Sequence, residues 1–359
     1  MNGRRLSTAR STIRTHGLMP DSTAGAAASE MEFVRPEAVP PDGPDPIRLG
    51  ISACLLGREV RYDGTHSRDR FLTDELGKWV VWVPGCPEVA IGLGTPRPAI
   101  RLERRDGATR LVQRDGAEDL TDRMREHAEA RIEALRNAGI SGYVLKNRSP
   151  TCGMERVKVW EEGGMPSRDG VGVFARVLME RMPHLPVEEE GRLNDPALRE
   201  NFVARLFAYW RWRELLAAGA SRPRLFDYHR RHKFLLMSRE PAAVQELGRL
   251  LGTADASVDP ADLAERYMDR FTRAMKTTPT RKKHTNVLQH VAGYLSDELD
   301  GGDRRELSET IHDYRTGLVP LVVPITLLRH HLRRIGQSYL EEQVYLRPHP
   351  HELMLLNRV

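Results

Sequence analysis

Short apolar runs alternate with helical stretches in the first half of the chain. The runs IRLGISA, VVWVPG, GYVLK and RVKVW are bounded by Gly, Pro or charged residues, and this pattern predicts strands. Helices are expected around residues 70–78, 119–137 and 171–181. In the second of these, Met124, Ala128, Ile132 and Leu135 fall on one face. Strands that alternate with helices predict an α/β domain with a mainly parallel sheet, in Rossmann-like layers.

A hairpin and a linker complete this first domain. The segment RLERRDGATRLVQRDG predicts a β-hairpin that turns at Asp106 and Gly107. The segment MPHLPVEEEG combines prolines with three successive glutamates, and we interpret it as a linker. We therefore expect the first domain to cover residues 46–185. Residues 1–45 are dominated by small residues and proline without apolar periodicity, so we expect a disordered tail there.

The strand pattern nearly disappears after Leu193. A long helix is expected to begin with Asn194 as N-cap and Pro196 in its first turn. Helical periodicity continues through LFDYHRRHKFLLMS, PAAVQELGRLLG, ADLAERYMDRFTRAMK and RKKHTNVLQHVAGYLSDEL. The sequence therefore predicts that an all-α C-terminal domain, residues 186–359, follows the α/β domain.

Composition narrows the class of protein without identifying a partner. The 359 residues carry a formal net charge of only +5, so a basic surface has to be local. No apolar run reaches the roughly 18 residues of a membrane-spanning helix, so we expect no membrane partner. Three cysteines cannot all be paired in one chain, and the resulting free thiol is typical of a reducing compartment. We expect a cytoplasmic protein.

The three cysteines occupy similar places in the predicted pattern. Cys54 and Cys86 lie at the ends of predicted strands, and Cys152 follows a third strand by a short loop. The carboxyl ends of parallel strands border one crevice, so the three thiols could meet there. Three thiolates favour soft metals and would leave a coordination position open for chemistry. The alternative is that they are unrelated buried cysteines, because free cysteine is often a small core residue.

Three motifs around these cysteines resemble a known family. The motifs SACLLGREVRYDG, PGCPEVAIGLGTPRP and LKNRSPTCG occur in the order found in the thiouracil desulfidase family. In the second half, HRRHKFLLMS, KHTNVLQHVAGYLS, YRTGLVPLVVPITLLRHH and VYLRPHPHELMLLN resemble the YbgA-like domain. The fusion of both modules is similar to tRNA 4-thiouridine desulfidases. The resemblance covers residues 47–160 and 225–357.

The resemblance implies a cofactor and a reaction. Members of the family hold a 4Fe-4S cluster by three cysteines, which here would be Cys54, Cys86 and Cys152. They remove sulfur from thiolated pyrimidines without net redox change. Glu88 and Ser149 match family positions implicated in catalysis, as a general base for water and as a hydrogen-bonding or proton-relay group. From the residues alone, Glu88 could equally cap backbone amides, and Ser149 could belong to a turn.

Cationic residues beside the cysteines are substrate candidates. Lys146 and Arg148 precede the third cysteine, where they could offset thiolate charge or hold a phosphate. Arg61 and Arg97 lie in the family-like segments RYDG and GTPRP, and either could contact substrate. For Lys146 and Arg148 a solvated loop pair is the alternative.

Basic clusters in the second half suggest a nucleic-acid partner. Residues 205–239 hold nine Arg or Lys against two acids, and residues 270–283 hold six against none. Trp210, Trp212 and Tyr228 interleave the first cluster, and rings beside cations suit unpaired bases. Taken alone, these aromatic residues could instead be core residues, with the arginines on a solvated face. Together with the resemblance to tRNA 4-thiouridine desulfidases, the clusters lead us to expect tRNA containing 4-thiouridine as the partner. The alternatives are a desulfidase of free thiouracil or thiouridine, and a non-enzymatic metal-bearing RNA-binding regulator.

Overall fold

A computed structural model describes residues 31–34, 46–114, 118–161, 164–255 and 257–357. The expected tail therefore lies outside the described residues, apart from residues 31–34. Val34 in that short segment forms an antiparallel bridge with Trp82. No helix of the described residues has both the length and the apolar character that crossing a membrane requires.

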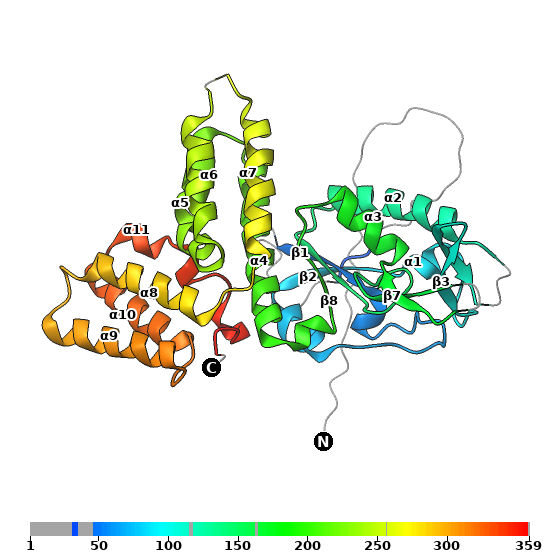
Figure 1. Cartoon of the computed structure of the whole chain (residues 1–359), viewed down its shortest axis with the longest axis horizontal. Coiled ribbons are helices and arrows are strands. Elements are labelled where there is room, and N and C mark those ends of the chain that lie inside the picture. Colours follow the sequence, from blue (N-terminus) through cyan, green and yellow to red (C-terminus); the bar gives the residue numbers. More distant parts are fainter. Residues whose placement is uncertain (1–30, 35–45, 115–117, 162–163, 256, 358–359) are drawn as a thin grey trace. The chain divides into compact units, whose positions relative to one another are not determined.

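Four parallel strands form the first sheet. They are β1 (Ile47–Ser52), β2 (Val80–Gly85), β5 (Gly142–Leu145) and β8 (Val187–Glu189), in the order β2-β1-β5-β8. The predicted parallel sheet is confirmed (Figure 1). Strand β8 lies in the segment that we interpreted as a linker. Its three residues are buried and pair with β5. The linker prediction is wrong here because a run of glutamates is not typical of a buried strand.

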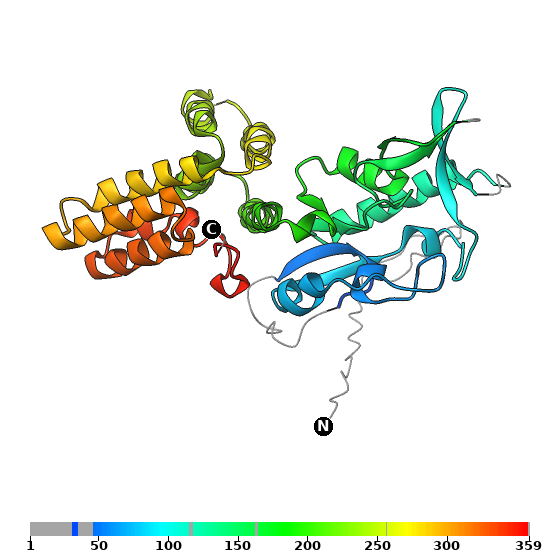
Figure 2. The same ribbon diagram turned by 60° about the horizontal axis from the view of Figure 1, so that its bottom comes forward.

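Helices cover both faces of this sheet. Helices α2 (Thr121–Asn137) and α3 (Val173–Arg181) lie side by side (Figure 2). Phe174 of α3 contacts the ring of Tyr143 on β5 at a centroid distance of 5.8 Å. The four apolar residues predicted for the inner face of α2 are all buried. Leu49 and Ile51 of β1 share another core with Phe202 and Leu206 of the long helix α4 (Pro196–Ala217).

The segment before β2 differs from a regular helix. Residues 71–78 form a π-helical turn, Phe71–Glu75, and a 3-10 turn, Leu76–Lys78, instead of the expected α-helix. Gly77 accounts for the tight packing there, because an added Cβ would lie 2.9 Å from the carbonyl oxygen of Leu72. The segment still buries Phe71 and Leu72 in the core shared with α4.

A second, mixed sheet has the order β4-β3-β6-β7. The predicted hairpin is confirmed: β3 (Ile100–Arg105) and β4 (Ala108–Gln113) pair antiparallel through a two-residue turn. Asp106 and Gly107 both have positive φ, 50° and 75°, as this turn requires. Strands β6 (Val157–Trp160) and β7 (Ser167–Gly170) complete the sheet, so RVKVW belongs to this second sheet.

The rest of the described chain is helical, as predicted, and α8, α9 and α10 lie side by side (Figures 1 and 2). Helix α4 begins differently from the expectation, because Asp195 and not Asn194 is its N-cap. The Asp195 carboxylate accepts hydrogen bonds from the amides of Ala197 and Leu198, at 2.7 and 3.2 Å. The other long helices are α5 (Arg222–Arg239), α6 (Pro241–Thr253), α7 (Pro260–Met275), α8 (Arg281–Leu295), α9 (Gly301–Thr316) and α10 (Val322–Ile335).

Candidate active site

The three cysteines follow neighbouring strands of the parallel sheet. Cys54 lies in the 3-10 turn Ala53–Leu56 directly after β1. Cys86 comes directly after β2, as the residue before the short helix α1 (Pro87–Ala90). Cys152 follows β5 by a loop of six residues. Since β1 lies between β2 and β5, all three cysteines come from the carboxyl edge of adjacent strands.

The three thiols are close enough to interact electrostatically. Cys54 and Cys152 are buried, and all three thiols are free. Burial, followed by repulsion from Cys86, raises the pKa of the Cys54 thiol to about 12. Burial also raises the pKa of Cys152, and the charges of Glu88 and Cys86 add to the effect. The thiols therefore remain protonated at neutral pH unless a positively charged group joins them.

No group of three or more His, Cys, Asp or Glu side chains within the described ranges could hold a metal ion as placed. Cys54 and Cys152 are buried and Cys86 is half-buried, so the three free thiols differ in their access to solvent.

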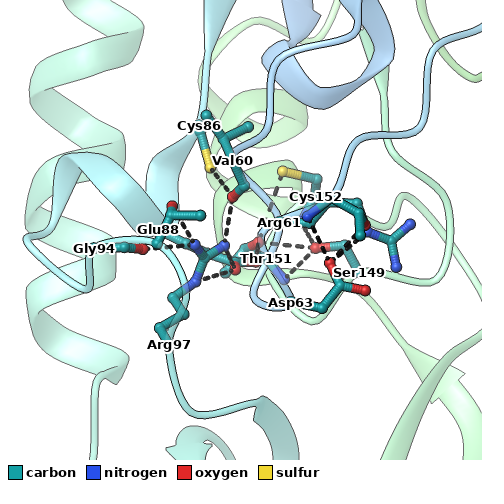
Figure 3. Close-up of polar contacts among 12 residues, drawn as sticks. Val60, Arg61, Asp63, Cys86, Glu88, Gly94, Arg97, Ser149, Thr151 and Cys152 are labelled. Carbon is teal, nitrogen blue, oxygen red and sulfur yellow. Dashed lines mark hydrogen bonds and ion pairs between the residues drawn. The ribbon is translucent and has the colours of Figure 1, made fainter.

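Glu88 forms a buried ion pair beside Cys86 (Figure 3). One carboxylate oxygen, Oε2, accepts hydrogen bonds from Nε and Nη2 of Arg97, the former at 3.1 Å. The Arg97 side chain is 2% exposed, and its remaining N–H groups donate to Val60, Gly94 and Thr95. Its five N–H groups are therefore all used within the protein. Arg97, expected as a possible substrate contact, instead holds the Glu88 carboxylate in place.

Ser149 and Glu88 are joined through Thr151. The Thr151 hydroxyl donates to Oε1 of Glu88 at 2.6 Å, and it lies 2.9 Å from the Ser149 hydroxyl (Figure 3). Because the single proton of Thr151 is given to the carboxylate, the Ser149 hydroxyl donates to Thr151. Ser149 also accepts from the backbone amides of Thr151 and Cys152, at 3.2 and 3.1 Å. The result is a directed chain from Ser149 through Thr151 to Glu88.

Two glycines let this loop pack against its neighbours. An added Cβ on Gly153 would lie 2.4 Å from a methyl group of Val157 and 2.8 Å from the Ser149 carbonyl oxygen. On Gly172, the N-cap of α3, it would lie 2.4 Å from the Thr151 carbonyl oxygen. Glycine is required at both positions because the backbones approach so closely. Gly172 therefore fixes Cys152 against the start of α3.

Lys146, in the loop after β5, forms an ion pair close enough to Cys54 to influence its pKa. Its ammonium group bonds to a carboxylate oxygen of Glu190 and, at 2.6 Å, to the side-chain oxygen of Asn147. The Lys146 charge lowers the pKa of Cys54 against the larger effect of burial, whereas the Glu190 charge raises it. The ion pair joins two residues that each directly follow a strand, Lys146 after β5 and Glu190 after β8.

Arg61 and Arg148 differ in the polar partners of their side chains. Arg61 donates to the Ser67 hydroxyl at 2.6 Å and lies 3.5 Å from Asp63, and its charge lowers the pKa of Cys54. Arg148 is exposed and has a positive φ of 57°, directly before Ser149. Of the four cationic candidates, Arg148 is the one whose guanidinium bonds to none of the described residues.

Most aromatic residues expected to meet bases are core residues. Trp212 and Tyr228 are 3% and 4% exposed, and their rings pack edge to face at 5.2 Å. Many cations of the basic segments are also paired inside the protein. Arg205 bonds to Glu188, Arg239 to Glu200, and Arg270 to Glu240 and Glu246. The prediction that these segments form an RNA surface therefore gains no support from their aromatic residues.

Comparisons with known proteins agree with this organisation. Residues 49–190 match the model of the 2-thiouracil desulfurase family, a span that contains the three cysteines. The chain is 32% identical over 153 residues to the uncharacterized protein YbbK of Bacillus subtilis (strain 168), covering 40% of this chain and 97% of YbbK. The chain belongs to the 2-thiouracil desulfurase family.

The second half matches a different family. Residues 233–350 match a protein family of unknown function, DUF1722. The uncharacterized protein YbgA of Escherichia coli (strain K12) is 27% identical over 156 residues, covering 44% of this chain and 92% of YbgA. The expected fusion of a desulfidase module with a YbgA-like module is therefore confirmed.

One solved structure is also similar. It is the [4Fe-4S]-dependent thiouracil desulfidase TudS, which is 32% identical, with a TM-score of 0.35, covering 43% of this chain and 97% of the TudS chain. The cluster and the activity in this description are those of TudS.

Proposed function

We propose that this 2-thiouracil desulfurase family member holds a 4Fe-4S cluster and converts 4-thiouridine in tRNA to uridine. Water enters, the C=S group becomes C=O, and the sulfur leaves as hydrogen sulfide, so the overall reaction needs no oxidant or reductant. The observation that carries the proposal is the placement of three free thiols at the ends of adjacent parallel strands. The similarity to TudS supports the choice of cofactor.

The donor set fits such a cluster. Thiolates are the usual ligands of iron–sulfur clusters, and three of them leave one iron without a protein ligand. When bound, the cluster supplies a Lewis acid for the thiocarbonyl sulfur. Cys54, Cys86 and Cys152 would hold it. Their raised pKa values mean that binding has to displace protons, which a strongly cationic iron site can do.

Glu88 is placed to accept a proton from water. Its Oε2 is occupied by Arg97, whereas Oε1 accepts from Thr151 among the described residues and keeps a lone pair for a water molecule. Arg97 holds the carboxylate in one orientation, which a general base needs. We assign Glu88 as the base that takes a proton from the attacking water.

Ser149 and Thr151 extend this acid–base group. The hydrogen-bond chain ends at the Ser149 hydroxyl, next to the amide of Cys152. A proton that reaches Glu88 can return once both hydroxyls rotate. The protonated carboxyl then donates to Thr151, Thr151 donates to Ser149 in place of one backbone amide, and Ser149 donates to the substrate. We assign Ser149 as the group that delivers this proton to the pyrimidine nitrogen or to the departing sulfur. Thr151 connects the two.

The remaining cations position the substrate. Arg148 is exposed beside Ser149, where it could hold a phosphate of the substrate strand. Lys146, paired with Glu190, and Arg61 lower the cost of negative charge on the thiolates. The fused helical module would hold the rest of the tRNA, and both tRNA and reduced thiols are expected in the cytoplasm.

Anaerobic purification tests the cofactor. The chain should be brown with about four irons, and Cys54→Ala, Cys86→Ala and Cys152→Ala should each lose both cluster and sulfide release. Glu88→Gln should keep the cluster but lower turnover by about 100-fold or more, within the range of general base catalysis. Glu161→Gln, an exposed carboxylate of the same domain, is the matched control. An iron-free chain that still releases sulfide would refute the cluster.

Substrate preference is tested by comparing tRNA with the free nucleoside. We expect kcat/KM for 4-thiouridine in intact tRNA to exceed that for free 4-thiouridine by at least about tenfold, because an RNA-binding module adds binding energy. Equal values would instead indicate a desulfidase of free thiopyrimidines. Tight RNA binding without sulfide release from either substrate would indicate a regulator.

A further inference from the structure

Three arginines of the helical region are not neutralised within the described part of the protein. They are Arg329 and Arg333 of α10 and Arg347 of the segment that follows it. No acidic group or hydrogen-bond acceptor among the described residues pairs with them, in contrast to Arg239 and Arg270. Burial lowers the pKa of Arg329, and the charges of Arg347 and Arg333 lower it further. The three cations therefore repel one another, and a bound anion would relieve this repulsion.

A cavity lies beside these cations. Its volume is about 350 Å³, and its lining includes Arg329, Arg347 and His349. Ile325 and Leu356 contribute apolar surface on the same cavity. A volume of this size is within the range of small-molecule sites. The cavity thus combines two cations with an apolar wall, which suits a ligand that has an anionic end and a flat or apolar body.

His349 adds an unsatisfied acceptor to the lining. Its Nδ1 lies 3.0 Å from the Pro350 carbonyl oxygen, which can only accept, so Nδ1 carries the proton. Burial lowers the pKa of His349, so the ring is neutral and Nε2 keeps its lone pair. This Nε2 is buried without a hydrogen-bond partner among the described residues, as is Nε of Arg329. Two residues that line the cavity therefore leave one buried donor and one buried acceptor without a partner in the described part of the chain.

The cavity wall is held rigidly. Pro348 and Pro350 flank His349 and fix its backbone, and Arg211 of α4 donates to the Pro348 carbonyl oxygen at 3.2 Å. Leu346 packs into the core of the helical region, whereas Leu353 packs into the core beneath the parallel sheet. A wall anchored at both ends is organised before a ligand binds, which reduces the entropy cost of binding.

We propose that this cavity binds one ribonucleotide unit of the RNA substrate. Arg329 and Arg347 take the phosphate, and Arg333 adds to the field that attracts it. His349 Nε2 accepts from the ribose 2′-hydroxyl, the group that distinguishes RNA from DNA. The base lies against the apolar wall. This inference rests on the proposed tRNA substrate and gives that substrate a specific contact on the helical module.

Fluorescence anisotropy of the full holoenzyme with a labelled single-stranded oligoribonucleotide tests the proposal. We expect Arg329→Ala and Arg347→Ala each to weaken binding by about tenfold and to reduce the salt slope by about one. Arg305→Ala removes the same charge from an exposed, unpaired site on α9 and should change binding less than twofold. The DNA strand of the same sequence should bind the native protein more weakly than RNA.

The outcomes separate this proposal from the proposed function. Equal losses of RNA affinity in Arg347→Ala and Arg305→Ala would overturn the proposal that the cavity binds RNA. Equal binding of RNA and DNA would also overturn it, even if the enzyme releases sulfide from tRNA. Free 4-thiouridine should be turned over at the native rate by Arg305→Ala, which lies outside the cavity. Failure of the native protein to release sulfide from any thiopyrimidine would overturn the proposed function. The binding data would still show whether the cavity binds RNA. Both substituted side chains are unpaired, so melting temperatures should not fall.

Discussion

The Thr151 hydroxyl donates a 2.6 Å hydrogen bond to the Glu88 carboxylate, across 63 positions of the sequence. Thr151 belongs to the loop after β5, and Glu88 belongs to α1 after β2. The bond therefore joins the surroundings of Cys152 and Cys86, two thiols that the chain brings from different strands. Through the Thr151 hydroxyl it also connects the carboxylate to Ser149, which shares no hydrogen bond with Glu88 among the described residues.

Replacement of Thr151 by valine should break this chain without changing the size of the side chain. We expect Thr151→Val to lower the rate of sulfide release by about 10- to 100-fold, within the contribution of a positioned proton-transfer group. Thr151→Ser keeps the hydroxyl and should retain most activity. Iron content and visible absorption should be the same in both variants. Equal activity of the valine and serine variants would exclude Thr151 from proton transfer.

Removal of the Arg97 guanidinium should destabilise the protein strongly. Arg97→Met leaves Glu88, whose side chain is 13% exposed, without its cation, and breaking such a pair costs about 3–5 kcal/mol. Urea unfolding of the chain measures this loss. Arg181→Met breaks the exposed pair with Glu129 and should cause no measurable change. If both variants unfold at the same urea concentration, the Glu88–Arg97 pair has no structural role.

The Gly172 contact gives a third prediction, which is purely steric. Gly172 has φ −58° and ψ 144°, values that alanine adopts without strain, so only the contact with Thr151 and Cys152 opposes a side chain. We expect Gly172→Ala to lower stability by about 1–3 kcal/mol and to reduce cluster content. Gly252→Ala, in helix α6 with nothing within 4 Å, should instead be neutral or stabilising by up to about 1 kcal/mol. Similar losses in both would refute the steric explanation.

The elements of the fold were predicted best where the apolar pattern was regular. Alternation and length placed β1, β2 and β5, and the 3.6-residue period placed α2 with its buried face. Strand β8 was missed because its buried residues are glutamates, whose burial is compensated by partners distant in sequence. Besides nearby Arg192, Glu188 bonds to Arg205, 17 residues away, and Glu189 accepts from the Met154 amide, 35 residues away. Such pairing cannot be read from a local pattern.

The sequence provides candidate residues for the site but not the hydrogen bonds that connect them. Cys54, Cys86, Cys152, Glu88 and Ser149 were all chosen from the sequence, and the structure brings their segments to one edge of the parallel sheet. The role of Thr151 is not predicted from the sequence, although this residue lies between Ser149 and Cys152. A threonine hydroxyl indicates no catalytic role until its hydrogen-bond partners are known. The role of Arg97 cannot be predicted from the sequence either, since only the fold reveals that all its donors are used within the protein.

Acid should destabilise the helical region through buried histidine. Burial lowers the pKa of His232 to about 3, whereas unfolding returns it to about 6.5, so the unfolded state binds more protons between these values. Its contribution to stability is complete above pH 6.5 and is lost as pH falls, by up to about 1.4 kcal/mol per pH unit. His232→Phe keeps a ring against Tyr228 and should flatten urea-midpoint profiles between pH 6.5 and 4, whereas exposed His312→Gln should follow the native profile. If the urea midpoint of His232→Phe falls with pH as steeply as that of the native protein, this imidazole does not cause the loss of stability. It would then be protonated in the folded protein as readily as in the unfolded one.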